Sequence, residues 1–215
     1  MKEKILPKLK WFFASFIWLG ILFLAADIIS KNVVVSAHNS GSLPVQVIPG
    51  FLQIEYTVNS NFVFGLDLFH NDIATRIVFV IVALGISAGI IVFLIKRWGK
   101  VHKFYKACLM MIMSGAIGNS IDRIFYTSSY LASPKTGVVD WIDFYGVWKF
   151  HFNIADIAVV VAAIMMIIFM IVTEIIDYRK KVKLQPKAPE DNEKVISKTE
   201  QEKNKFLEKK DNKDE

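Results

Sequence analysis

The chain has 215 residues, 53% of them hydrophobic, and its 26 Lys and Arg against 20 Asp and Glu give a net charge of +6. The mean hydropathy is +0.40, and the apolar residues come in long blocks without a helical or strand period, which excludes an ordinary soluble domain. The single cysteine, Cys108, excludes an internal disulfide.

Four apolar blocks approach or exceed the roughly 20 residues that a helix needs to cross the hydrocarbon core of a bilayer. They run over about residues 11–26, 73–95, 107–125 and 154–176. The first extends to Ile29 if Asp27 lies at the membrane surface. The third is the least apolar of the four. We predict an all-α membrane protein with four transmembrane helices in a domain of residues 1–176.

The first block permits a second interpretation. Basic residues followed by an apolar stretch ending in Ala25-Ala26 also fit a cleavable signal peptide. Leu24, however, stands where a small residue is preferred, and three further spans need an anchor with this topology. We expect the segment to be retained as a transmembrane helix.

The distribution of basic residues predicts the orientation. Four lysines precede the first block, and five basic residues without an acidic one lie between the second and third blocks. The positive-inside rule places both segments, and therefore both termini, in the cytoplasm. The other two connections, residues 28–72 and 126–153, then face outward.

Residues 33–63 predict a small β-rich element on the outer membrane surface. Its β-prone runs are Val33-Val34-Val35, Leu43 to Ile48 and Phe51 to Val58. Turn-forming residues, Asn39-Ser40-Gly41 and Pro49-Gly50, separate these runs. We expect this extracellular element to receive an extended peptide or to shield a site.

Residues 177–215 differ from the rest of the chain. They hold 12 Lys and Arg against 10 Asp and Glu, and very few large apolar residues. Such a segment cannot bury a core. We expect a disordered, charged cytoplasmic tail that binds neither nucleic acid nor membrane.

Four aspartates lie in or against the apolar blocks: Asp27, Asp122, Asp140 and Asp156. A carboxylate near lipid costs several kcal/mol or more, so each is a candidate functional residue. Asp27 and Lys31 are four residues apart and share a helix face. Their pairing fits a simple helix-end ion pair and a role in supporting an active site equally well.

Asp122 precedes Arg123, which favours a structural ion pair, or a carboxylate held by Asn119 and the neighbouring backbone. Asp140 and Asp156 remain without a basic neighbour in the sequence. Two carboxylates brought within about 3 Å share one proton and so supply a base and an acid at the same pH. The base activates water to attack a peptide carbonyl, and the acid protonates the leaving nitrogen.

Other chemistries find little support. The four histidines are scattered over different loops without a zinc motif, and no Gly-x-Ser-x-Gly or activated serine occurs. We therefore expect no metal and no cofactor. A transporter that relays protons through its aspartates is the rival class, but the halves of the chain show no internal repeat. An inactive scaffold is disfavoured by the intact aspartate pair.

Several motifs, in this order on the four blocks, carry a family resemblance: Asp27-x-x-x-Lys31, Asn59 followed by Phe64, Gly115-Ala116-Ile117-Gly118-Asn119-Ser120-Ile121-Asp122-Arg123, Val138-Val139-Asp140 and Phe152-Asn153-Ile154-Ala155-Asp156. Over residues 11–176 the chain resembles the bacterial lipoprotein signal peptidases, or signal peptidases II. The last three motifs are highly specific.

The resemblance implies a membrane aspartic endopeptidase of the bacterial plasma membrane. It would cleave prolipoproteins just before a cysteine that carries a diacylglyceryl group, at the outer face, and globomycin-type inhibitors would block it. We expect a monomer. The implied catalytic residues are Asp140 and Asp156. The implied substrate-binding or supporting residues are Asp27, Lys31, Asn59, Asn119, Asp122, Arg123 and Asn153. The β-rich element would correspond to the family's β-cradle, and Trp141 to Phe152 to its amphipathic outer loop.

Three departures from the family pattern concern the shape of the substrate groove. The segment Asn59-Ser60-Asn61-Phe62-Val63-Phe64 lacks the Gly-Ala-Ala that usually follows the asparagine. Ser114 stands where glycine is common, and Trp141 replaces a phenylalanine. The aspartate pair itself is unchanged.

Overall fold

The computed structural model describes residues 11–60, 72–128, 135–184 and 198–203. The chain divides into two compact units, residues 1–168 and 169–215. All features of the first unit below lie within residues 11–168. The second unit contains the last part of helix α5 and a short helical segment at 198–203.

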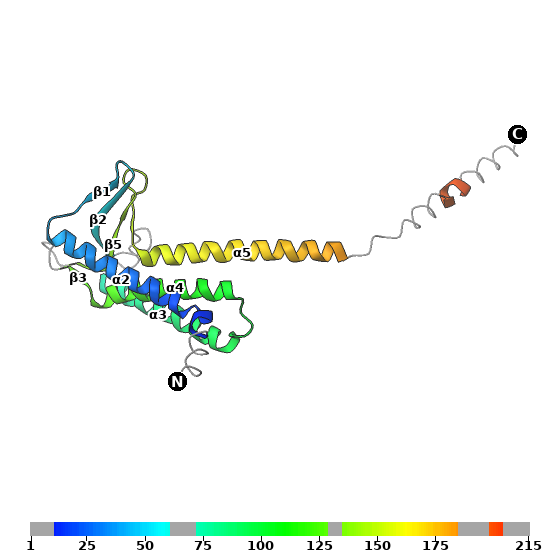
Figure 1. Ribbon diagram of the computed structural model, residues 1–215, viewed down its shortest axis with the longest axis horizontal. Coiled ribbons are helices and arrows are strands. Elements are labelled where there is room, and N and C mark those ends of the chain that lie inside the picture. Colours follow the sequence, from blue (N-terminus) through cyan, green and yellow to red (C-terminus); the bar gives the residue numbers. More distant parts are fainter. Residues whose placement is uncertain (1–10, 61–71, 129–134, 185–197, 204–215) are drawn as a thin grey trace. The chain divides into compact units, whose positions relative to one another are not determined.

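Four long helices form the framework: α2 (Ile17–Asn39), α3 (Asp72–Arg97), α4 (Lys103–Phe125) and α5 (Ile154–Leu184). Helices α2 and α3 both pack against α4, which therefore lies between them (Figure 1). The buried core joins α4 to the start of α5 through Cys108, Met111, Ala158 and Ala162. Burial of these side chains supplies the non-polar contact between the two helices.

Three of these helices are long and apolar enough to cross a membrane: Ile17–Asn39, Ile73–Arg97 and Ile154–Lys183. The sequence predicted four transmembrane helices. By length and apolar composition, the described residues contain three. Helix α4 is the exception. Its last two turns carry Asn119, Asp122 and Arg123, and α2 and α3 flank the helix on two sides. Polar residues that face other helices are tolerated at membrane depth.

An antiparallel sheet packs against α2 and α4 (Figure 1). Its strands, in the spatial order β1-β2-β5-β6, are β1 (Val45–Ile48), β2 (Leu52–Asn59), β5 (Val138–Asp143) and β6 (His151–Phe152). A second, two-stranded sheet pairs β3 (Thr127–Ser128) with β4 (Lys135–Thr136). The turn between β1 and β2 uses Gly50 at φ 72°, a conformation that favours glycine.

The β-rich element differs from its prediction in two respects. The runs around 43–48 and 51–58 form β1 and β2, but Val33-Val34-Val35 lies inside α2. The helix continues there because Lys31 and Val34 are buried by its neighbours, and tertiary contacts override β propensity. The sheet is completed by β5 and β6, which come from the predicted outer loop and were not expected as strands.

The ends of two predicted helices also need correction. The first block is interrupted at Phe16, whose φ of 59° separates a helical turn at 11–15 from α2. Helix α5 continues through the predicted tail boundary to Leu184. Good helix formers and an Asp177–Lys180 pair of 3.6 Å favour this extension. The remaining predictions for the tail, at 185–197 and 204–215, lie outside the described residues.

Two glycines of α4 allow close contacts with α5 and α2. A Cβ built on Gly115 would lie 2.5 Å from the Ala155 carbonyl oxygen, and one on Gly118 would lie 2.7 Å from Asp27 Oδ2. The absence of a side chain at Gly115 thus lets the first turn of α5 pack against α4. At Gly118 it leaves room for the Asp27 carboxylate, which projects from α2.

The first prediction tests this packing. Gly115→Ala should destabilise the protein by about 1–3 kcal/mol, because the new methyl group meets backbone that must shift. Thermal unfolding in detergent would measure the change. The matched control is Gly89→Ala in α3, where a Cβ meets nothing within 4 Å. Equal melting temperatures for the two variants would contradict the close contact.

Candidate active site

The Lys31 ammonium lies at the centre of the polar cluster. It is 2.7 Å from Asp27 Oδ2, 3.0 Å from Asp122 Oδ2 and 3.0 Å from Asn119 Oδ1. Lys31 is 3% exposed and Asp27 is 1% exposed, so these contacts are made away from water. An ammonium has three N–H donors and no acceptor. The contact to Asn119 is a hydrogen bond, and the contacts to Asp27 and Asp122 are ion pairs. Asp27 Oδ2 has no hydrogen-bond partner among the described residues, so the ammonium is its charge partner.

The two carboxylates that contact Lys31 reach onward to backbone amides. The amide of Ala155, in the first turn of α5, donates to Asp27 Oδ1 at 2.9 Å. The amide of Val139, in β5, donates to Asp122 Oδ2 at 3.1 Å. The predicted i,i+4 pair of Asp27 and Lys31 is confirmed, and its contacts tie it to the polar cluster. The buried ammonium thus connects α2 and α4 to the elements that carry Asp140 and Asp156.

Asp156 belongs to a capping box at the start of α5. Asn153 Oδ1 accepts from the Asp156 amide at 2.9 Å, and Asp156 Oδ2 accepts from the Asn153 amide at 3.2 Å. This reciprocal pattern satisfies two amides that a helix N-terminus leaves unpaired. It fixes the Asp156 carboxylate on the first turn, where the helix dipole favours a negative charge. The spacing of Asn153 and Asp156 is a capping-box signal that the sequence carries.

The orientation of the Asn119 amide follows from its neighbours. Because Lys31 can only donate, it must contact the Asn119 oxygen, which leaves the Asn119 nitrogen free to donate. That nitrogen lies 2.8 Å from Asp156 Oδ1. Asn153 Nδ2 also reaches the Asn119 oxygen, at 3.1 Å. The cation therefore aligns a neutral donor on Asp156.

Asp140 is held from two other directions. It lies on β5 and is 2% exposed. Asn59 Nδ2, from the neighbouring strand β2, donates to Asp140 Oδ2 at 3.0 Å, and Asn153 Nδ2 donates to Asp140 Oδ1 at 2.7 Å. Burial raises the pKa of the Asp140 carboxyl to about 7, and the nearby charge of Asp156 adds to the rise, whereas both amides oppose it.

Asn153 is the residue common to both carboxylates. Its side chain donates to Asp140 and its backbone amide donates to Asp156. The charge of Asp156 acts on Asp140, so protonation of one carboxyl depends on the other. Such a pair can hold one proton between two carboxyl groups near neutral pH, as acid–base catalysis requires.

Arg123 occupies a different position from the predicted one. Among the described residues, Asp122 forms its ion pair with Lys31 and not with Arg123. The guanidinium lies 5.3 Å from the centre of the Phe79 ring, and its Nη1 donates to the Asn119 backbone carbonyl at 3.4 Å. Arg123 thus links α3 to the end of α4, and its charge lies near enough to interact with Asp140 and Asp156.

The structure brings all nine predicted site residues into one connected region, but it leaves their catalytic or supporting roles as predictions.

Of the three departures from the family pattern, the first cannot be placed, because residues 61–63 and Phe64 lie outside the described residues. Ser114 donates to the carbonyl of Met111 in its own helix. Trp141 follows Asp140 on β5, and its buried indole N–H has no acceptor among the described residues.

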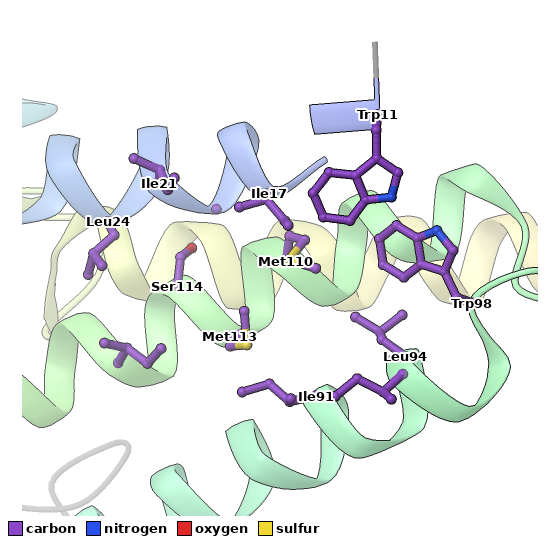
Figure 2. Close-up of a pocket in the computed structure, with 13 residues that line it drawn as sticks. Trp11, Ile17, Ile21, Leu24, Ile91, Leu94, Trp98, Met110, Met113 and Ser114 are labelled. Atoms are coloured by element: carbon purple, nitrogen blue, oxygen red, sulfur yellow. The ribbon is translucent and has the colours of Figure 1, made fainter. Parts of the chain in front are cut away.

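An apolar cavity of about 610 Å³ lies elsewhere in the first unit, between α2, α3 and α4. Figure 2 shows Trp11 and Trp98 at one end of it, with Leu94 and Met110 nearby. None of the nine predicted site residues lines this cavity. It offers an acyl chain room but no group for proton transfer.

Comparisons with known proteins identify the family. A family model described as Signal peptidase (SPase) II matches residues 19–172, which include all nine site residues. The chain belongs to the signal peptidase II family. It is therefore an aspartic endopeptidase of bacterial membranes. The lipoprotein signal peptidase of Fusobacterium nucleatum is 33% identical over 153 residues, which cover 71% of this chain and 84% of the relative. That of Clostridioides difficile is 33% identical over 160 residues, 74% of this chain and 96% of the relative.

The fold has a counterpart among solved structures. A structure described as a bacterial membrane enzyme, determined by the in meso method, superimposes with a TM-score of 0.57. The superimposed region covers 80% of this chain and 93% of the solved chain, and the two sequences are 23% identical. This similarity shows a membrane-enzyme fold with helices and a small antiparallel sheet.

The second prediction concerns Lys31. Lys31→Met should destabilise the protein by about 3–5 kcal/mol, because it leaves the carboxylates of Asp27 and Asp122 buried without their cation. Unfolding in detergent would measure the loss. Lys180→Met is the control, since its pair with Asp177 is exposed and contributes little. A Lys31→Met protein as stable as the wild type would refute the central role of this ammonium.

Proposed function

We propose that Asp140 and Asp156 are the catalytic dyad with which this signal peptidase II removes signal peptides from prolipoproteins. The observation that carries the assignment is the shared partner Asn153, which donates to both carboxylates. Family membership supports the reaction, and the burial of Asp140 supports its role as the protonated member.

The proton would lie on Asp140, and Asp156 would act as the base. Asp156 takes a proton from a water molecule, and the resulting hydroxide attacks the scissile carbonyl to form a tetrahedral intermediate. Asp140 gives its proton to the leaving nitrogen as the C–N bond breaks. Asn59, Asn119 and Asn153 keep the carboxyl oxygens oriented throughout.

The membrane arrangement proposed with this function has four crossing helices, with both termini in the cytoplasm. The basic segments before α2 and between α3 and α4 support this orientation. The sheet β1-β2-β5-β6 and the dyad would then lie at the outer face. Helix α4 would cross although it is less apolar, because its polar end faces α2 and α5.

The proposed substrate is a prolipoprotein whose cysteine already carries a diacylglyceryl group. Each methylene that enters the bilayer contributes about 0.8 kcal/mol, so two acyl chains hold the scissile bond at the membrane surface. A free peptide must obtain this positioning from side-chain contacts alone. Strand β2, which carries Asn59, lies beside β5 and would guide the extended peptide toward Asp140.

The third prediction tests the dyad. Asp140→Asn and Asp156→Asn should each reduce cleavage by a factor of about 100 or more, because an amide cannot exchange the proton. Asp177→Asn, an exposed aspartate of α5, is the control and should cleave like the wild type. The assay measures cleavage of a lipidated prolipoprotein in detergent. More than a tenth of the wild-type rate in either dyad variant would remove that residue from the mechanism.

The fourth prediction concerns pH. Asp140 has a pKa of about 7, so it is protonated below this value and ionised above it. The rate should therefore fall as the pH rises through about 7, because both carboxyl groups are then ionised and the acid is lost. The dependence of kcat/KM on pH measures the effect. A rate that stays constant from pH 6 to about pH 9 would contradict Asp140 as the acid.

The fifth prediction concerns lipidation. Cleavage of the diacylglyceryl-modified precursor should be faster than that of the unmodified precursor by a factor of at least about 100, since the acyl chains supply positioning. Globomycin should compete with the lipidated substrate. Equal rates for the two precursors would overturn the substrate proposal, although the aspartic chemistry could still stand.

A further inference from the structure

Three potential metal ligands lie on neighbouring strands of the larger sheet, outside the proposed dyad. Asp143 of β5 is directly opposite Gln53 of β2 and directly opposite His151 of β6. Side chains at opposed positions of antiparallel strands share a face, and Glu55 lies two residues beyond Gln53 on the same strand. The register therefore places Asp143 beside His151, and Glu55 follows Gln53 where the pairing becomes irregular between Ile54 and Thr57.

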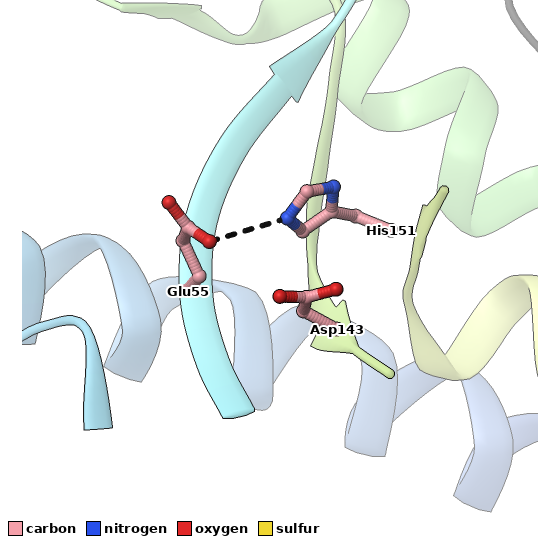
Figure 3. Close-up of side chains that lie close together, drawn as sticks. All are labelled: Glu55, Asp143 and His151. Atoms are coloured by element: carbon pink, nitrogen blue, oxygen red, sulfur yellow. Dashed lines mark hydrogen bonds and ion pairs between the residues drawn. The ribbon is translucent and has the colours of Figure 1, made fainter. Parts of the chain in front are cut away.

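The three side chains lie close together. Figure 3 shows Glu55, Asp143 and His151 converging from three strands. One ligand atom of each lies within 4.8 Å of the other two, and His151 Nε2 is 3.5 Å from Glu55 Oε2. Two ligands of one tetrahedral zinc ion at about 2.1 Å lie roughly 3.4 Å apart. The histidine–glutamate distance already has this value, and the partly exposed Glu55 can close the remaining gap.

Asp143 is the observation that points to a ligand. It is 7% exposed, and its carboxylate has no hydrogen bond or ion pair with any described residue. Burying an unpaired carboxylate is costly, and buried charges in proteins are paired or coordinate metals. The side chain of Gln53, also 7% exposed, donates a hydrogen bond to Glu55 at 3.0 Å and not to Asp143. A cation among the three side chains would supply the missing partner.

We propose that Glu55, Asp143 and His151 bind one divalent transition-metal ion of the zinc type. One imidazole nitrogen and two carboxylate oxygens form a three-ligand set with room for a water molecule or another donor. The imidazole favours zinc over magnesium and calcium, which prefer oxygen ligands. The scattered positions of the histidines along the chain predicted no metal site. The sheet assembles this set from residues far apart in sequence.

Such an ion would stabilise the sheet next to the dyad. Asp143 lies three residues after Asp140 on the same strand, and His151 lies two residues before Asn153. A metal that joins β2, β5 and β6 would therefore hold together the three strands that lead to Asn59, Asp140 and Asn153. Its role would be structural, since no hydrogen bond joins its ligands to the dyad among the described residues.

The test measures zinc binding by the full-length chain, purified in detergent without a histidine tag and stripped with a chelator. We expect one Zn²⁺ per chain and a melting temperature that rises when zinc, but not magnesium, is added. Asp143→Asn and His151→Gln should each weaken zinc binding at least about tenfold and abolish the rise. If Asp143→Asn does not fold, Glu55→Gln, at a partly exposed position, replaces it.

Two controls distinguish this site from others. His38→Gln removes a histidine that stacks on Tyr56 at 4.3 Å, and Asp140→Asn alters the dyad. Both should bind zinc like the wild type. Loss of zinc in Asp140→Asn would move the metal to the dyad and overturn the proposal. Unchanged binding in Asp143→Asn or His151→Gln, or no stoichiometric binding by the wild type, would also overturn it.

Discussion

The rest of the site depends on one buried ammonium, that of Lys31. Desolvating an ammonium and two carboxylates costs several kcal/mol per ion, and the attraction between them offsets this only when the geometry is good and every remaining donor and acceptor is satisfied. Here each of the three side chains that contact Lys31 holds a further element. Asp27 holds the first turn of α5, Asp122 holds β5, and Asn119 holds the Asp156 carboxylate. Removal of the cation would therefore release all three elements at once.

The network also keeps the cation at a distance from the chemistry. A lysine in direct contact with a carboxylate favours its ionised form and makes a shared proton harder to hold. In this protein Lys31 contacts Asp27 and Asp122, and only the neutral amide of Asn119 lies between it and Asp156. The carboxyl groups of Asp140 and Asp156 are oriented by amides of Asn59, Asn119 and Asn153. Neutral donors fix geometry with a smaller effect on the proton affinity than a contacting cation would have.

Local patterns in the sequence predicted the features that depend on short spacings. The i,i+4 spacing of Asp27 and Lys31 and the turn at Pro49-Gly50 each specify a contact or a bend through nearby residues. Features set by distant partners were missed. Strand β5 has a β-prone sequence, but only its pairing with β2 makes it a strand. Val33-Val34-Val35 has one too, yet it is helical, with Val34 buried by tertiary contacts that override β propensity. Neither of the two arrangements predicted for Asp122 included Lys31, which is 91 positions away in sequence and adjacent in space.

The hydropathy of the helices differs according to whether they face lipid or other parts of the protein. Helices α3 and α5 expose many isoleucines and valines, as a surface facing lipid requires. Helix α4 falls short of the apolarity of a membrane span because it carries Asn119, Asp122 and Arg123, and these residues contact α2, α3, β5 and α5 instead of lipid. A helix enclosed by others can carry the polar groups of a site at a depth where an exposed helix could not. The least hydrophobic long helix thus carries three of the predicted supporting residues, next to the proposed dyad on β5 and α5.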